Sequence, residues 1–207
     1  MIVLSHRGYW KKPDEKNTVT AFKHSFRLGF GTETDIRDCK NNIVISHDAP
    51  DGSEMLLRDF LHISEGFNGM LGLNIKSDGL AENLNKMMHN FPELNYFTFD
   101  MSIPDMRAYL DIGLPVFCRV SEVEPHPPWL DECKGVWLDS FFEDWFDASD
   151  VKKFLNMGKA VCVVSPELHN RPYINMWKKL SMIKDNKKLY ICTDFPEEAE
   201  LFFKGNH

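Results

Sequence analysis

The chain has 207 residues, and its 31 acidic and 24 basic side chains give a formal net charge of -7 at pH 7. Hydrophobic residues at 43% and charged residues at 27% are typical of a globular protein that can bury a core. The acidic balance excludes a nucleic-acid-binding surface, which would need a stripe of positive charge, so any phosphate ligand must meet a local cationic site. No apolar run reaches the roughly 20 residues that span a bilayer.

The beginning of the chain predicts a strand rather than a targeting segment. Met1 is followed directly by Ile2, Val3 and Leu4, which leaves no room for a signal peptide. The five cysteines include no CxxC pair, and three of them lie in apolar runs, so we expect reduced thiols in the core. We therefore expect a cytoplasmic protein with one domain over residues 1–207, and the sequence carries no indication of its oligomeric state.

Short apolar runs alternate with helix-type segments along the whole chain. Residues 121–128 contain three prolines and predict an irregular loop in place of a helix. In chain order, the expected strands are residues 2–5, 32–36, 71–75, 96–99, 115–120, 135–138, 160–164 and 189–192.

Start and stop signals mark most of the helices between these strands. The signals are Thr18 before a helix that ends at Gly29, Ser77 and Asp78 before residues 80–88, Pro104 in a first turn, Ser149 and Asp150 before residues 151–155, and Pro196 at the start of the last helix.

Eight strands that alternate with helices and are buried on both faces predict an α/β fold. A parallel sheet closed into a (β/α)8 TIM-type barrel fits best, and the short chain implies that it is compact and somewhat distorted. A doubly wound open sheet is the alternative from periodicity alone. Each expected strand ends in polar or charged residues, which is where barrel enzymes place their active sites.

Two carboxylates lie on one expected strand. Glu33 and Asp35 are two residues apart, so both side chains emerge on the same face. They repel each other unless a proton or a cation lies between them, and a hard divalent ion prefers such oxygen ligands. An isolated pair of this kind more often belongs to a solvated strand edge.

Four further side chains could supply acid–base and phosphate chemistry. His6 ends the first strand and His47 follows an apolar run; as a pair they suit general acid–base catalysis, and singly each could be a structural histidine. Arg7 could hold phosphate oxygens through its planar fork of donors, or form a surface ion pair. Lys76 closes the strand of residues 71–75 and would stabilise charge that develops on a phosphoryl group.

Several short motifs occur together in this chain. They are His6-Arg7-Gly8, Glu15 and Asn17-Thr18 followed by Ala21-Phe22, Gly29, Glu33-x-Asp35, Ile43 to Asp48, the strand that ends at Lys76, and Thr193-Asp194-Phe195-Pro196. In combination they resemble the glycerophosphodiester phosphodiesterase family. That family is similar in turn to the phosphatidylinositol-specific phospholipase C superfamily.

The resemblance implies an enzyme of lipid and glycerol metabolism. It would be a distorted barrel that binds one divalent cation, Mg²⁺, Ca²⁺ or Mn²⁺. Its partner would be a small-molecule glycerophosphodiester, hydrolysed to glycerol phosphate and an alcohol. One histidine would deprotonate the glycerol hydroxyl that attacks phosphorus, the other would protonate the departing alcohol, and water would open the cyclic phosphate. The implied roles are acid–base catalysis for His6 and His47, phosphate binding for Arg7 and Lys76, and metal binding for Glu33, Asp35 and Asn74.

The chain departs from the family's pattern at two places. The third metal-binding carboxylate normally stands two residues before the lysine, where this chain has Asn74, so we expect weaker metal binding. Asp48 or Asp100 could compensate for the missing charge. The second departure is Glu15-Lys16-Asn17, where the family usually has Glu and Asn adjacent, so the loop beside His6 has an added residue.

Two other functions stay open at this point. Asn74 favours a barrel that has lost turnover and only binds phosphodiesters or phosphosugars, whereas the retention of His6 and His47 disfavours it. A lyase-type phosphodiesterase would release the cyclic phosphate. The sequence indicates neither the alcohol of the substrate nor the preferred metal.

Overall fold

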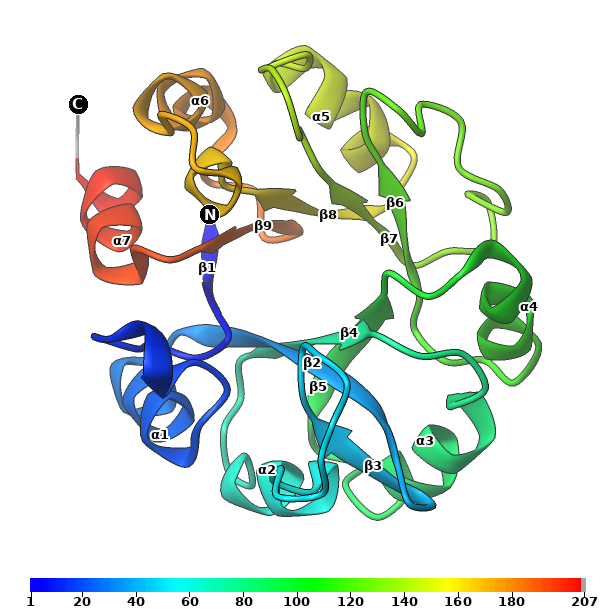
Figure 1. Ribbon diagram of the computed structural model, residues 1–207. Coiled ribbons are helices and arrows are strands. Elements are labelled where there is room, and N and C mark those ends of the chain that lie inside the picture. The colour runs from blue at the N-terminus through cyan, green and yellow to red at the C-terminus, as the bar shows by residue number, and fades with distance from the viewer. Residues whose placement is uncertain (206–207) are drawn as a thin grey trace. The chain divides into compact units, whose positions relative to one another are not determined.

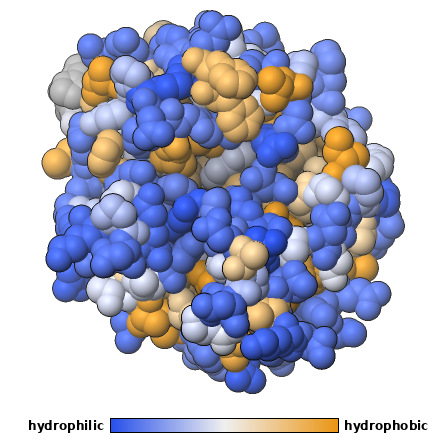
Figure 2. All heavy atoms as spheres, in the orientation of Figure 1, coloured by the Kyte–Doolittle hydropathy of each residue, from blue (hydrophilic) through white to orange (hydrophobic). Residues whose placement is uncertain are grey.

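The computed structural model describes residues 1–205. Its contacts divide the chain into two compact units, His6–Val116 and Met1–Ser5 together with Phe117–His207. Figure 2 shows hydrophilic residues over most of the face in view, with hydrophobic residues in scattered groups. None of the described helices is long and apolar enough to cross a membrane.

The unit His6–Val116 is built on a parallel sheet with one antiparallel strand. Strand β2 (Gly31–Cys39) pairs in parallel with β4 (Met70–Ile75), which pairs in parallel with β5 (Asn95–Phe99). Strand β3 (Asn42–Ile45) runs antiparallel along β2. The helices of this unit flank the strands in Figure 1; they are the 3-10 turn η1 (Pro13–Glu15), α1 (Val19–Leu28), α2 (Leu57–Ile63), α3 (Ala81–Met88) and α4 (Ile103–Asp111).

Helix α1 shows how sequence signals and burial act together. The Thr18 hydroxyl accepts a hydrogen bond from the Ala21 amide, and Gly29 ends the helix in the left-handed conformation, as the sequence predicts. The helix buries Phe22, whose ring packs 4.6 Å from the ring of Phe60 on α2. Burial of a ring of this size contributes about 2 kcal/mol or more, which holds both helices against the sheet.

The other unit is also built on a parallel sheet. Its strands are β1 (Ile2–His6), β6 (Phe117–Val120), β7 (Gly135–Leu138), β8 (Ala160–Val164) and β9 (Leu189–Thr193). They pair in the order β1-β9-β8-β7-β6. Figure 1 shows the longer helices beside these strands; the helical segments are α5 (Ala148–Asn156), η2 (Pro166–His169), α6 (Ile174–Leu180), η3 (Ser181–Ile183) and α7 (Pro196–Lys204).

The strand connectivity confirms the predicted fold class. The parallel strands follow the order β5-β4-β2-β1-β9-β8-β7-β6, which is the chain order of a (β/α)8 barrel of the TIM type. All eight expected strands are present, and residues 121–128 form the predicted irregular loop. The single domain over residues 1–207 stays a prediction.

Three local features differ from the sequence predictions. Strand β3 was not expected, because its turn uses Lys40 and Asn41, both left-handed, without the glycine that normally marks a hairpin. Helices α2 and α6 also lacked start signals, and no side chain caps either one. Asp147 caps α5 in place of Ser149 and Asp150, and Leu80 is the N-cap of α3 in place of Ser77 and Asp78.

Gly8 generates a stability prediction. Its φ is +81°, and a Cβ there would lie 2.8 Å from Ala21 Cβ and 2.9 Å from the Ala21 carbonyl carbon. Gly66 has φ +79° with nothing within 4 Å, so it is a matched control for the backbone strain alone. We expect Gly8→Ala to lower the free energy of unfolding by about 2 kcal/mol more than Gly66→Ala, measured by urea denaturation. Equal losses would show that the loop moves away from α1 at little cost.

Candidate active site

Strand β2 carries the two predicted carboxylates, and all site residues named below lie in the unit His6–Val116. Glu33 is 1% exposed and Asp35 is fully buried. Because side chains alternate along a strand, both point to the same face, as the sequence predicts. Two buried carboxylates on one face require partners, since an isolated charge in the interior costs several kcal/mol.

Arg7 and Asn17 supply much of that compensation from the loop after β1. The backbone amide of Arg7 donates to Glu33 Oε2 at 3.1 Å, and its Nε lies 2.8 Å from Asp35 Oδ2 as an ion pair. Asn17 Nδ2 donates to the same Asp35 oxygen at 2.9 Å, and the backbone N–H of Asn17 donates to the Arg7 carbonyl. Arg7 and Asn17 both adopt left-handed backbone conformations, at φ 58° and 59°. This strain is retained where the surrounding contacts hold it, which is common at functional sites.

Lys76 adds a second cation on the other side of Asp35. It follows the last residue of β4, and its backbone amide donates to the Ile36 carbonyl of β2. Its Nζ lies 3.4 Å from Asp35 Oδ1 and 3.8 Å from Asp100 Oδ2. Asp35 therefore has a cation near each of its oxygens.

Asn74 lies directly beside Asp35 in the sheet. The two residues are register partners in the β2–β4 pairing, and Asn74 is only 7% exposed. Its Oδ1 is buried without a hydrogen-bond partner, whereas Asp35 Oδ1 accepts no hydrogen bond but lies 3.4 Å from the Lys76 ammonium. Buried oxygens without donors are rare in native proteins, because each one loses its hydration. The Asn74 oxygen, which lies beside the Asp35 carboxylate on the paired strand, therefore indicates a place for a cation or a ligand.

The pKa of Glu33 follows from this crowding. Burial, followed by the charge of Asp35, raises the pKa of the Glu33 carboxyl to about 7. His6, Arg7 and Lys76 act in the opposite direction through their positive charges. Near neutral pH, Glu33 therefore exchanges readily between a neutral and an ionised form.

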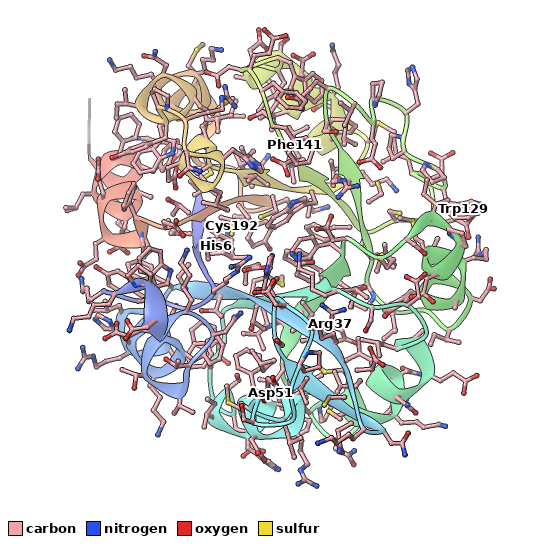
Figure 3. All side chains as sticks on the ribbon, viewed as in Figure 1. His6, Arg37, Asp51, Trp129, Phe141 and Cys192 are labelled. Atoms are coloured by element: carbon pink, nitrogen blue, oxygen red, sulfur yellow. The ribbon has the colours of Figure 1, made fainter. Side chains whose placement is uncertain are left out.

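The two histidines have different surroundings. His6 ends β1, with Nε2 4.0 Å from Glu33 Oε2 and a side chain that is 15% exposed. His47 is 45% exposed, and its Nδ1 lies 2.9 Å from Asp48 Oδ1. Two contacts fix the segment that carries His47: the Ser46 amide donates to the Asp35 carbonyl, and Arg37 Nη1 donates to the His47 carbonyl. Figure 3 labels His6 and Arg37 on the two strands that carry them.

The structure thus brings Arg7, Glu33, Asp35, Asn74 and Lys76 together, with His6 beside Glu33. The roles of these residues stay predictions. Sequence reasoning missed three contributions: the Asn17 contact to Asp35, the Arg37 support of His47, and the pairing of Asp100 with Lys76. Asn17 had a signal, since it belongs to a motif noted in the sequence, and Asp100 was noted as an acid that could compensate for the missing charge, although its pairing with Lys76 was not expected. The added residue near Glu15 does not prevent this contact.

Two findings bear on how a divalent ion would fit. In the described part of the chain, no group of three or more His, Cys, Asp and Glu side chains is placed to hold a metal. Asn74 offers an uncharged oxygen where a third carboxylate is missing, and with the carboxylates of Glu33 and Asp35 it would make up an all-oxygen donor set. The residues therefore fit a hard cation, with fewer charges than a strong site uses. Asp48 is no substitute here, since its side chain is 93% exposed and bound to His47.

The raised pKa of Glu33 predicts a pH-dependent difference in stability. Above pH 4.5 the unfolded carboxyl loses its proton, whereas the folded one keeps it until pH is about 7. The protonated carboxyl therefore contributes stability at low pH that is lost as pH rises through this window. We expect the free energy of unfolding of Glu33→Gln, relative to that of the wild type, to rise by up to about 3 kcal/mol between pH 4.5 and pH 8. The measurement is urea denaturation in the presence of a metal chelator. A difference that does not change with pH would contradict this account.

Comparison with known proteins gives structural matches only. No protein-family model and no curated protein sequence matches the chain. A glycerophosphodiester phosphodiesterase from Parabacteroides distasonis is 18% identical, with a TM-score of 0.70 over 98% of this chain and 96% of that one. The enzyme of the same type from Agrobacterium tumefaciens is 13% identical, with a TM-score of 0.70 over 99% of this chain and 100% of that one.

A more distant match is a Ca²⁺-dependent phosphatidylinositol-specific phospholipase C from Streptomyces antibioticus. It is 9% identical, with a TM-score of 0.62 over 98% of this chain and 95% of that one. Both kinds of enzyme were expected from the motifs in the sequence. The chain therefore has the fold of the glycerophosphodiester phosphodiesterases and of their phospholipase C-like relatives.

Proposed function

We propose that this protein is a phosphodiesterase that hydrolyses a glycerophosphodiester to glycerol phosphate and an alcohol with the help of a divalent cation. The observation that carries the proposal is the buried pair Glu33 and Asp35, which lies beside the unsatisfied Asn74 oxygen and is flanked by His6, Arg7 and Lys76. Cations, carboxylates and imidazoles gathered at strand ends are the groups that phosphoryl chemistry requires.

The two histidines would carry the proton transfers. One imidazole removes the proton of the substrate's glycerol hydroxyl as that oxygen attacks phosphorus, and the other gives a proton to the departing alcohol. In a second stage, water opens the cyclic phosphate and the two roles reverse. Asp48 accepts from His47 Nδ1, which favours the form that presents Nε2 to the substrate.

Arg7 and Lys76 would bind the phosphate oxygens. In the structure both lie against Asp35, at 2.8 Å and 3.4 Å. A substrate phosphate would share these two cations with Asp35. The positive charges are therefore already in place when the substrate binds. Preorganised charges of this kind stabilise the developing charge without rearrangement during the reaction.

A divalent cation would be held by Glu33, Asp35 and the Asn74 carbonyl oxygen, and it would draw charge from a phosphoryl oxygen when bound. Mg²⁺ and Ca²⁺ both suit an all-oxygen site, and Mn²⁺ is a third candidate. We further propose that the protein acts on a small-molecule substrate in the cytoplasm.

The acid–base assignment can be tested by mutation. We expect His6→Ala and His47→Ala each to lower kcat by about 10²-fold or more, because each removes a group that moves a proton. The assay would use a panel of glycerophosphodiesters with Mg²⁺, Ca²⁺ or Mn²⁺, and thermal unfolding would confirm that the variants fold. His89→Ala is the matched control, since His89 is an exposed histidine at the C-cap of α3. Near-normal kcat in either site variant would overturn the pairing.

Asn74 provides a test of the metal site that needs no activity. We expect Asn74→Glu to raise the affinity for Mg²⁺ or Ca²⁺ by about tenfold or more, measured by titration calorimetry, because it adds a charged oxygen ligand. Asn83→Glu adds the same charge at an exposed position of α3 and controls for long-range attraction. If both variants bind the ion equally, Asn74 is not a ligand.

One observation favours a second candidate function. Asp35 is already neutralised by Arg7 and Lys76, and Asn74 carries no charge, so a pure phosphodiester-binding protein would be stable without a metal. Absence of turnover with every metal, on a panel that includes larger phosphodiesters, would support this binding function. Release of a cyclic phosphate, seen by phosphorus NMR, would instead identify a lyase-type enzyme.

A further inference from the structure

Arg37 is a partly buried cation of β2. It stands two residues after Asp35, so the alternation of side chains places it on the face that carries Glu33 and Asp35. Figure 3 labels Arg37 on this strand. In the described part of the chain, its side chain makes one hydrogen bond, from Nη1 to the His47 carbonyl at 3.2 Å, and no carboxylate forms an ion pair with it.

The guanidinium of Arg37 also contains a donor that no group of the protein accepts. Its Nε is buried, and it has no hydrogen-bond partner among residues 1–205. Such donors are rare in native proteins, because a buried N–H without an acceptor loses its hydration and gains nothing in return. A positive charge that is partly removed from water without a partner adds to this cost. An anionic oxygen beside Nε would supply both the acceptor and the charge.

The acidic residues around Arg37 are placed so that none of them fills this role. Asp35, on the same face, is already held by two cations and an amide. Asp38 follows Arg37 directly, so its side chain projects to the opposite face of the strand. The Asp48 side chain is 93% exposed and bound to His47 Nδ1. The missing anion is therefore one that the protein does not provide.

The register of the sheet places Arg37 next to the proposed phosphate site. Ile36 of β2 pairs with Ile75 of β4, and the Lys76 backbone amide donates to the Ile36 carbonyl, so Arg37 and Lys76 are the next residues across the two strands. Neighbouring strands are about 5 Å apart, and partners in a parallel pair present their side chains to the same face. A group bound at Arg37 thus lies within a few bonds of a phosphate that is bound at Lys76.

We propose, on the basis of the function proposed above, that Arg37 selects the alcohol of the substrate by binding a second anionic group that this alcohol carries. The group is a carboxylate or a phosphate a few bonds from the phosphodiester, and it accepts from Nε while Nη1 keeps the His47 carbonyl. The planar fork of an arginine matches the oxygens of both groups. The glycerol part of the substrate carries only hydroxyl groups, which cannot neutralise a guanidinium, so the anion belongs to the alcohol.

The test compares two matched pairs of substrates. Glycerophosphoserine differs from glycerophosphoethanolamine by one carboxylate, and glycerophosphoglycerol phosphate differs from glycerophosphoglycerol by one phosphate. In at least one pair, we expect the wild type to have a kcat/KM about tenfold or more higher for the member with the added anion. The pair that shows this preference identifies the group as a carboxylate or a phosphate.

Variants of Arg37 connect the preference to this side chain. Arg37→Gln removes the charge and the fork, so we expect the ratio of kcat/KM within the pair to fall to about one. Arg37→Lys keeps a charge but lacks Nε, and it should lower the ratio several-fold. Arg58→Gln is the matched control, since Arg58 is an exposed arginine of α2, and it should keep the wild-type ratio.

The ratio within a pair separates ligand binding from support of His47. If Arg37 only held the His47 carbonyl, Arg37→Gln would lower kcat equally on both members and leave the ratio unchanged. That result overturns the inference, and so does a wild type without a preference in either pair. Where the glutamine variant does not fold, an unchanged ratio in Arg37→Lys has the same meaning.

Calorimetry keeps this test separate from that of the proposed function. The four compounds are titrated into His6→Ala and into the same variant with Arg37→Gln added, so that affinities are compared without turnover. If the wild type hydrolyses none of them, the proposed function fails, and the binding ratios still decide the role of Arg37. Equal affinity for both members of each pair in His6→Ala would overturn it.

Discussion

The rest of the candidate site depends on the burial of two carboxylates on one face of β2. Glu33 and Asp35 are both almost completely removed from water, and their mutual repulsion must be compensated. Around Asp35 the compensation comes from two cations and an amide, contributed by Arg7, Lys76 and Asn17. Around Glu33 it comes from a backbone amide and from a proton that is held up to about pH 7. The positions of nearly all the polar groups follow from this requirement.

The compensation also accounts for strained backbone. Arg7 points its amide at Glu33 and its guanidinium at Asp35, and it can do both because its backbone is left-handed. Gly8 then continues at positive φ close to Ala21, so the loop is pressed against the start of α1. Asn17 bonds both Arg7 and Asp35, which couples the loop to the sheet. Electrostatic need at the site thus explains conformations that local sequence preference alone would disfavour.

The site has more side chains suited to acid–base catalysis and phosphate binding than charged ligands for a metal ion. Arg7, Lys76 and His6 all lie near the carboxylates, whereas the third ligand position holds the uncharged Asn74. The buried Asn74 oxygen without a hydrogen bond still indicates that a donor or a cation belongs beside it. A weakly held cation that arrives with an anionic substrate would reconcile these facts, because the substrate would bring part of the charge that the protein lacks.

The sequence by itself determined the type and order of the elements. Alternating apolar runs and helix signals were enough to predict all eight parallel strands, and the spacing of Glu33 and Asp35 was enough to place them on one face. These are local properties, which depend on neighbouring residues and on the period of a strand. Strand β3 was missed because the turn at Lys40 and Asn41 carries no glycine signal.

Only the tertiary structure decided which distant residues meet. The pairing of Asn74 with Asp35 depends on the register of β2 against β4, and the contact of Asn17 with Asp35 involves a loop residue whose own backbone is left-handed. Register and loop path are set by the packing of the whole core, so no short stretch of sequence contains them.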